Sequence, residues 1–290
     1  MSFNSGAALA ALCAQNKTTI SEEMIRREIR VTGSGRDEIL QRMAHSYEIM
    51  KSAVRTSLTE DIHTVGGLIG GEAKKLYMQS QRAKPVCGSI MAKAAAYAMG
   101  VLEVNASMGL IVAAPTAGSS GVIPGAFLAL QEELGFSDNQ MTGALFNAGA
   151  VGYLITRNAT VSGAEGGCQA EVGTASAMAA SAAAELMGGT PGQCLDAASM
   201  AIGNLLGLVC DPVAGLVEAP CQKRNALGVS NALVCAQTAL SGIPGLIPFD
   251  EIVDAMYRVG RSLPTELRET AQGGCAATPT GCQLCKSVFH

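Results

Sequence analysis

Apolar residues recur at helical spacing along much of the chain, and no segment shows the regular alternation of a half-buried strand. The clearest repeat lies in residues 36–54, where apolar side chains return every three or four positions at Leu40, Met43, Tyr47, Met50 and Val54. Residues 174–187 are dominated by alanine, the strongest helix former. Patterns of this kind predict about ten helices, and the fold class is expected to be mainly α.

The ends of several helices carry their own signals. Thr19 with Glu22 three residues later is the signature of a capping box. A further helix is predicted to begin at Thr190, before a proline, and to run to about Val209. The last helix is expected to span residues 250–263, because Pro264 stops it.

A glycine-rich segment at residues 65–71 (VGGLIGG) divides a more polar helical region from the apolar remainder. Helices that are apolar on all sides belong in the middle of a bundle. We therefore expect a helical N-terminal lobe at residues 1–64 and a larger, bundle-like domain at residues 65–290. One continuous domain is the alternative.

Composition excludes several classes of protein. The chain is 48% hydrophobic and only 15% charged, which argues against disorder, and its net charge of −4 gives no reason to expect a nucleic acid partner. Residues 99–130 are strongly apolar but are interrupted by Glu103, Asn105 and Pro115, so they read as buried core and no membrane span is expected. Ten cysteines without an export leader indicate a reducing compartment, and we expect a cytoplasmic protein.

Three cysteines stand in loop contexts that contain glycine or proline: Cys168, Cys210 and Cys221. They lie too far apart in the chain to form the tight pairs typical of zinc and ferredoxin sites. On spacing alone, three unrelated buried thiols remain an alternative. The one tight pair, Cys282 and Cys285, lies at the C-terminus, where free thiols on a frayed tail are the simpler interpretation.

Five longer runs carry a more specific signal: GAEGGCQAEVG (163–173), LGLVCDPVAGLVEAPCQKRNA (206–226), EVNASMGLIVAAPTAGSSGVIPG (103–125), GLIGGEAKKL (67–76) and RETAQGGCAATPTG (268–281). Together they resemble the signature segments of iron–sulfur-dependent L-serine dehydratases. The resemblance covers most of the chain from about residue 18 onward and includes both cysteine spacings.

The resemblance implies a cofactor and a reaction. In that family the three matching cysteines bind three irons of a [4Fe–4S] cluster, which assigns Cys168, Cys210 and Cys221 as its ligands. The fourth iron stays open for substrate and acts as a Lewis acid in the conversion of L-serine to pyruvate and ammonia. Residues 65–290 would then form a cluster-binding catalytic domain with glycine-rich loops, serving amino-acid catabolism and gluconeogenesis.

The chain looks like the alpha chain alone, which implies a beta chain as partner, a hetero-oligomer and a site that the partner helps to complete. Related cluster enzymes remain alternatives, namely a cysteine desulfidase or a threonine dehydratase. A non-enzymatic, metal-stabilised subunit is a third.

The loop at residues 114–121 offers hydroxyl groups and flexible backbone N–H groups, a combination that suits a carboxylate. With the resemblance, its candidate substrate contacts are Thr116, Ser119 and Ser120; without it, the loop is an ordinary turn. Other candidates in or near the matching runs are Gly70, Gly71, Asn105 and Asn158, the last of which alternatively ties a helix end. Arg224 is either a carboxylate ligand or half of a structural ion pair.

The catalytic base stays unassigned. His63 is chemically suitable, Lys74 is a second possibility, and the beta chain is a third source. The chain departs from the family at Cys275, where leucine is usual, and carries Cys282 and Cys285 in addition. We hypothesise that Cys282 or Cys285 reaches back to the open iron.

Overall fold

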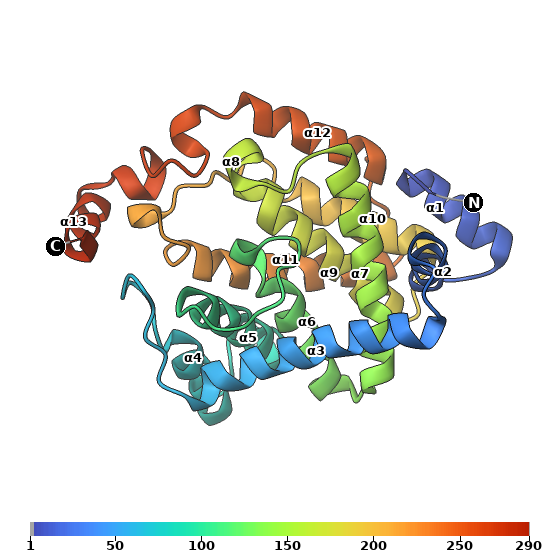
Figure 1. Ribbon diagram of the computed structural model, residues 1–290, viewed down its shortest axis with the longest axis horizontal. Helices are drawn as coiled ribbons and strands as arrows, with labels where there is room; N and C mark the ends of the chain where they lie inside the picture. Colours follow the sequence, from blue (N-terminus) through green and yellow to red (C-terminus); the bar gives the residue numbers. More distant parts are fainter. Residues whose placement is uncertain (1–2, 290) are drawn as a thin grey trace.

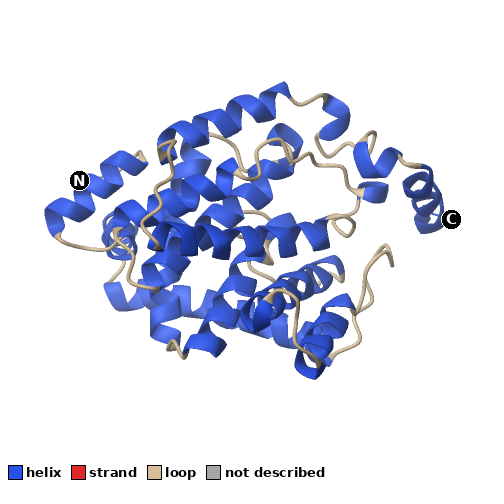
Figure 2. Ribbon diagram, turned by 180° about the vertical axis from the view of Figure 1, so that it is seen from behind, coloured by secondary structure: helices blue, strands red, loops and turns tan. Residues whose placement is uncertain are grey.

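The computed structural model describes residues 3–289, and Figures 1 and 2 show helices joined by loops, without strands in that range. The mainly α prediction is confirmed. The α-helices of the described residues are α1 (Gly6–Asn16), α2 (Ile20–Thr32), α3 (Arg36–Thr59), α4 (Glu72–Arg82), α5 (Gly88–Ala106), α6 (Val122–Leu134), α7 (Asp138–Asn158), α8 (Gly163–Gly166), α9 (Thr174–Leu186), α10 (Pro191–Gly203), α11 (Cys221–Leu240), α12 (Phe249–Ser262) and α13 (Pro279–Phe289).

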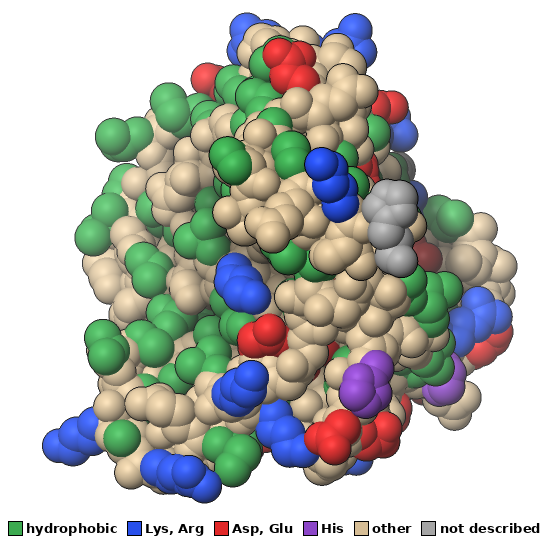
Figure 3. Space-filling view, turned by 90° about the vertical axis from the view of Figure 1, so that its left-hand side faces the viewer, with side chains coloured by type: hydrophobic (Ala, Val, Ile, Leu, Met, Phe, Trp, Pro, Cys, Tyr) green, Lys and Arg blue, Asp and Glu red, His purple; other side chains and the backbone are tan. Residues whose placement is uncertain are grey.

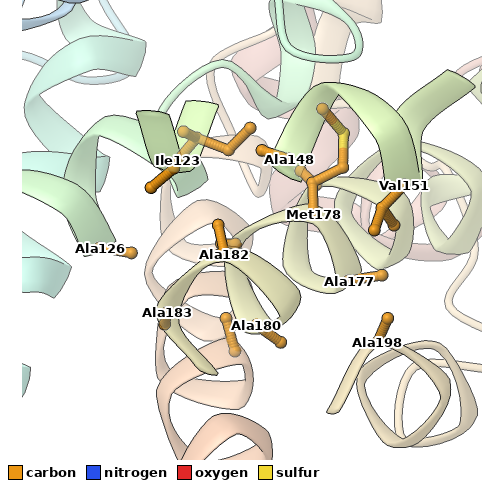
Figure 4. Close-up of a cluster of buried hydrophobic side chains, with 14 of the residues drawn as sticks. Ile123, Ala126, Ala148, Val151, Ala177, Met178, Ala180, Ala182, Ala183 and Ala198 are labelled. Atoms are coloured by element: carbon orange, nitrogen blue, oxygen red, sulfur yellow. The ribbon is translucent and has the colours of Figure 1, made fainter. Parts of the chain in front are cut away.

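Helix α9 forms the centre of the bundle, as its alanine-rich sequence predicts. Every residue from Thr174 to Ala184 is buried, and α6, α7, α10 and α11 pack around it. Figure 4 shows Met178 and the alanines of α9 facing Val151 of α7 and Ala198 of α10. Because alanine has the smallest side chain that still favours a helix, the neighbouring backbones approach closely and leave little void.

The first three helices share this core. Apolar side chains of α1, α2 and α3, including Leu9, Ile20 and Met50, belong to the same hydrophobic cluster as those of α9. Helix α2 packs on α7, and α3 packs on α5 and α7 (Figure 1). The predicted boundary at residue 64 falls in the loop between α3 and α4, and the division into two domains stays a prediction.

Two predicted helix ends need correction. The Thr19 hydroxyl accepts a hydrogen bond from the Glu22 backbone N–H, but the Glu22 carboxylate pairs with Arg36 and not with the cap, so only half of the capping box forms. Helix α10 ends at Gly203 and not near Val209. Residues 204–207 form turns instead, and the left-handed φ of 84° at Gly207 is incompatible with a helix that continues to Val209.

The prediction that the helix before Pro264 is the last one is also wrong. Residues 279–289 form α13, with Pro279 in its first turn and the Thr278 hydroxyl accepting from the Gly281 backbone N–H. Cys282 and Cys285 therefore lie on a helix that packs against residues 213–215, and the interpretation of this segment as a frayed tail is wrong.

The apolar run at residues 99–130 is core at both ends, as predicted, but the loop between them exposes Met108 and Leu110. It forms the end of α5 and most of α6, where every residue from Val122 to Leu130 is buried. Within residues 3–289, no helix combines the length and the apolar character that crossing a membrane requires.

Candidate active site

The three cysteines that the sequence singles out lie at the start of two helical segments and in a loop between helices. Cys168 precedes a π-helical turn (Gln169–Gly173) that leads into α9, Cys210 lies in the extended connection between α10 and α11, and Cys221 is the first residue of α11. All three side chains are buried, at 3%, 3% and 8% exposure. Short π-helical turns are rare and often mark functional sites.

Cys168 lies near both of the other thiols. Its proximity, together with burial, raises the pKa of Cys210 far above its usual range. Burial raises the pKa of Cys221 to about 12, and the nearby Cys168 and Glu171 add to that rise while Arg224 opposes it. Segments more than 40 residues apart thus converge on one buried group of sulfur atoms.

Hydrogen bonds to the backbone fix the loops that carry Cys168 and Cys210. The Gln169 backbone N–H donates to the Leu208 carbonyl at 2.9 Å, and its side-chain oxygen accepts from the Gly207 N–H at 2.9 Å. On the other side, the Cys210 N–H donates to the Leu267 carbonyl at 2.9 Å, and its carbonyl accepts from the Glu269 N–H at 2.7 Å. The C-terminal segment therefore pairs with the Cys210 loop like a very short strand.

Glycine at position 163 allows this close packing. A methyl group there would lie 2.6 Å from Oε2 of Glu171 and 3.2 Å from Sγ of Cys210. The motif GAEGGCQAEVG thus owes its first glycine to the approach of Glu171 and Cys210 and not to a turn.

Asn225 anchors the cysteine at the start of α11. Its side-chain nitrogen donates to the carbonyl oxygens of Cys221 at 3.0 Å and Gly118 at 2.8 Å, and its oxygen accepts from the Gly121 N–H at 3.0 Å. Asn225 is fully buried. It therefore joins the Cys221 helix to the loop of residues 114–121.

Within that loop, the three predicted hydroxyls differ. Thr116 Oγ1 donates to Oε1 of Glu171 at 2.7 Å and lies 3.1 Å from Oγ of Ser119. Ser119 and Ser120 are fully buried, and the Ser120 hydroxyl donates to the Ala117 carbonyl at 2.8 Å. Thr116 alone of the three keeps a partly exposed side chain, and the role of all three as substrate contacts stays a prediction.

The glycine-rich loop is tied to the cysteine segment by Glu218, three residues before Cys221. The buried Glu218 carboxylate accepts from the backbone N–H groups of Gly66 at 2.6 Å and Leu68 at 2.8 Å, and from the Thr64 hydroxyl at 3.0 Å.

Three predicted contacts lie on or beside this loop. Gly70 donates to the Glu72 carboxylate at 2.6 Å, and Gly71, with φ 84°, caps the start of α4. Asn105 lies in the last turn of α5, next to Ala106, whose carbonyl accepts from the Val65 N–H at 3.0 Å. Their contact with substrate stays a prediction.

Two other candidates have structural partners. Asn158 donates to the carbonyl oxygens of Asn4 at 3.0 Å and Leu154 at 2.9 Å, so it ties the N-terminal segment to the end of α7. Arg224 forms an ion pair of 2.7 Å with Asp211 and donates to the Val209 carbonyl at 2.8 Å. The ion pair expected as the alternative for Arg224 is therefore present.

Among the C-terminal cysteines, Cys275 approaches the site most directly. Its backbone N–H donates to Oδ2 of Asp211 at 2.6 Å, and burial together with the Asp211 carboxylate raises the pKa of its thiol. The Cys282 thiol lies 3.7 Å from the Ala276 carbonyl on the adjoining turn. The hypothesis that Cys282 or Cys285 reaches the open iron stays untested.

The donor set fits an iron–sulfur cluster better than a single ion. Burial and the nearby Cys168 raise the pKa values of Cys210 and Cys221, and Arg224 opposes the rise at Cys221, so further positive charge is needed to hold these two as thiolates. In the part of the chain that the structure describes, no three His, Cys, Asp or Glu side chains are arranged to hold one metal ion. Each cysteine of a cluster site binds a different iron, so convergence on one point is not required.

Sequence reasoning missed Glu171, Glu218 and Asn225. Each lies three or four residues from a predicted ligand, within the runs around Cys168 and Cys221, and that proximity is the signal that was available. Their partners Thr116, Gly66 and Gly118, however, are 55 to 152 residues away in the chain, so only the folded structure reveals them.

Comparisons with known proteins identify the family of the chain. Residues 15–276 match the family model described as serine dehydratase alpha chain. The chain is 49% identical over 281 residues to the probable L-serine dehydratase alpha chain of Bacillus subtilis (strain 168), which covers 97% of this chain and 93% of that one. It is 44% identical over 279 residues to the L-serine dehydratase alpha chain of Peptoniphilus asaccharolyticus, covering 96% of each.

A longer relative is L-serine dehydratase 2 of Escherichia coli (strain K12). It is 32% identical over 287 residues, which cover 97% of this chain but 62% of the relative. With the family model matching most of its length and relatives of this similarity, the chain belongs to the family of serine dehydratase alpha chains.

Proposed function

We propose that this chain is the alpha subunit of an L-serine dehydratase that converts L-serine to pyruvate and ammonia. One observation carries the proposal: Cys168, Cys210 and Cys221 converge in a buried site bordered by Thr116 and Glu171, in a chain of this family. The family gives the reaction class, and the thiols give a place for the cofactor that L-serine elimination calls for.

The cofactor we propose is a [4Fe–4S] cluster held by Cys168, Cys210 and Cys221. When bound, such a cluster supplies a Lewis acid that polarises the substrate hydroxyl and carboxylate. The burial of the three thiols and the proximity of Cys168 to both Cys210 and Cys221 support this assignment.

Residues of this chain would bind and orient the amino acid. We assign the loop of residues 114–121 to the substrate carboxylate, because its backbone N–H groups lie beside the cysteine site, where the Thr116 hydroxyl donates to Glu171. The glycine loop at Gly70 and Gly71, attached to the Cys221 segment through Glu218, would form a second wall with Asn105. Ser119 and Ser120, buried beneath Thr116, would shape the loop and exclude water.

A beta chain is the partner we propose, since the B. subtilis and P. asaccharolyticus relatives are named alpha chains. Large apolar side chains are exposed beside the glycine loop, namely Val65, Met108 and Leu110, and would be covered in a hetero-oligomer. Figure 3 shows apolar side chains spread over the end of the molecule that carries α4 and α13. The ten free thiols suit the reducing cytoplasm.

The test is turnover by the alpha chain, reconstituted with iron and sulfide without oxygen and combined with the beta chain. We expect pyruvate from L-serine at a kcat/KM well above that from L-threonine, and no sulfide from L-cysteine. Preference for threonine would make the chain a threonine dehydratase, and sulfide release from cysteine would make it a desulfidase. No turnover of any of the three would favour a non-enzymatic subunit.

A further inference from the structure

Removal of the α-proton of L-serine requires a base, and neither candidate from the sequence shares a pocket with the three cysteines. His63 and Lys74 line a pocket of about 410 Å³ together with Gly70 and Gly71, and no cysteine lines it. The Lys74 ammonium is 3.3 Å from the Asp61 carboxylate, so it already has a partner. The cysteine site itself contains a different group of suitable chemistry.

That group is the carboxylate of Glu171, three residues after Cys168 in the π-helical turn. It lies beside Cys210, because a methyl group on Gly163 would lie 2.6 Å from Oε2 of Glu171 and 3.2 Å from Sγ of Cys210, and its charge also acts on Cys221. The side chain is half-buried, so it is enclosed by protein but still reachable. A carboxylate in such a position is a candidate for proton transfer.

The two carboxylate oxygens of Glu171 have different surroundings. Oε1 accepts the 2.7 Å hydrogen bond from Thr116 and faces Gly118, where a methyl group would lie at 3.2 Å. Oε2 accepts no hydrogen bond among the described residues and points toward Gly163, where a methyl group would lie at 2.6 Å. Thr116 therefore fixes the carboxylate by one oxygen and leaves the other free beside a glycine.

We propose that Oε2 of Glu171 is the base that removes the α-proton of L-serine, with Thr116 as a positioning residue for the carboxylate. This inference rests on the proposed function. The Cα–H bond breaks and its proton moves to Oε2, while its electron pair forms the Cα=Cβ bond. The Cβ–O bond breaks, and the hydroxide takes up the proton from Glu171 and leaves as water. The resulting 2-aminoacrylate becomes an imine, which water hydrolyses to pyruvate and ammonia.

The test compares Glu171→Gln and Glu171→Asp with a matched control, Glu165→Gln. Glu165 belongs to the same sequence run but is exposed to solvent. Each alpha chain is reconstituted and combined with the beta chain. Iron and sulfide content, the absorbance change caused by L-serine, and kcat per cluster are then measured, with L-serine and with L-serine deuterated at Cα.

We expect Glu171→Gln to load the cluster and bind L-serine normally but to lower kcat by about 10² to 10⁴-fold, the usual contribution of a general base. Glu171→Asp keeps a carboxylate at a longer reach, so its loss is smaller and its deuterium isotope effect exceeds that of the wild type. Glu165→Gln retains wild-type values.

Three results would overturn the proposal: Glu171→Gln that keeps more than one hundredth of the wild-type kcat, Glu171→Gln that takes up no cluster, or an equal loss in Glu165→Gln. Failure of the proposed function is distinguishable, because the wild-type enzyme itself then makes no pyruvate from L-serine.

Discussion

Arg224 and Asp211 form an ion pair of 2.7 Å that links the neighbours of two predicted ligands. Asp211 follows Cys210, and Arg224 lies three residues after Cys221, one turn into α11. Only 3% of the Asp211 side chain and 14% of the Arg224 side chain are exposed. The pair therefore holds the Cys210 loop against the Cys221 helix from within the protein.

Replacing Arg224 by methionine should destabilise the alpha chain by about 3–5 kcal/mol, because the Asp211 carboxylate is left buried without a cation. Urea unfolding of the cluster-free chain measures the change. Arg258→Met is the control, since Arg258 pairs with Asp254 on the exposed face of α12 and should cost about 0–1 kcal/mol. Equal losses in the two variants would show that the Arg224–Asp211 pair has no special structural role.

The glycine at position 163 should not tolerate even a methyl group. Gly163→Ala places Cβ 2.6 Å from Oε2 of Glu171 and 3.2 Å from Sγ of Cys210, so we expect loss of cluster uptake while the helical content is retained. Gly143→Ala is the matched control, because Gly143 lies inside α7 with no other atom within 4 Å of the added methyl group. That variant should gain about 0.5–1 kcal/mol. Iron content and circular dichroism test the pair, and normal iron content in Gly163→Ala would contradict the close packing.

The free energy of unfolding should depend on pH because of Glu103. It is fully buried, and burial raises its pKa, with Glu72 as a second carboxyl group beside it. Since the folded state holds this proton more tightly than the unfolded state does, the contribution of Glu103 to stability is fully present below the ordinary glutamate pKa. It is lost as pH rises through the raised value.

Glu103→Gln imitates the protonated carboxyl group and can still accept the 2.7 Å hydrogen bond from Gln222. Urea unfolding at pH 5 and pH 8 should show a smaller decline in stability for this variant than for the wild type. An unchanged decline would mean that Glu103 is ionised in the folded protein.

Local sequence patterns predicted the fold class and several helices. Three predicted helices correspond to helices of the structure. They are the repeat at residues 36–54, the alanine-rich run at 174–187 and the segment that Pro264 stops. The end of α10 was missed because residues 204–207 form turns instead of continuing the helix expected from the local pattern, and the Gly207 backbone N–H bonds to the distant side chain of Gln169. Contacts of this range leave no trace in a local periodicity.

In the site, too, the sequence indicated some residues and missed others. Cys168, Cys210 and Cys221 were identified from their surroundings in the sequence, and the structure brings them together. Glu171 and Asn225 were missed because a glutamate or an asparagine near a cysteine has no distinctive pattern. Their importance comes from Thr116 and Gly118, which reach them only through the packing of the 114–121 loop against α11 and the π-helical turn.

The central claim is that three cysteines hold the cluster, and the most direct measurement is the iron and sulfide content of single serine variants after anaerobic reconstitution. Cys168→Ser, Cys210→Ser and Cys221→Ser should each lose most of the iron and the absorbance near 400 nm, and all pyruvate production with the beta chain. Cys235→Ser removes a buried thiol of α11 that contacts Asn204, and this variant should keep its iron, its absorbance and its pyruvate production. Full iron content and turnover in any one of the first three variants would contradict the assignment.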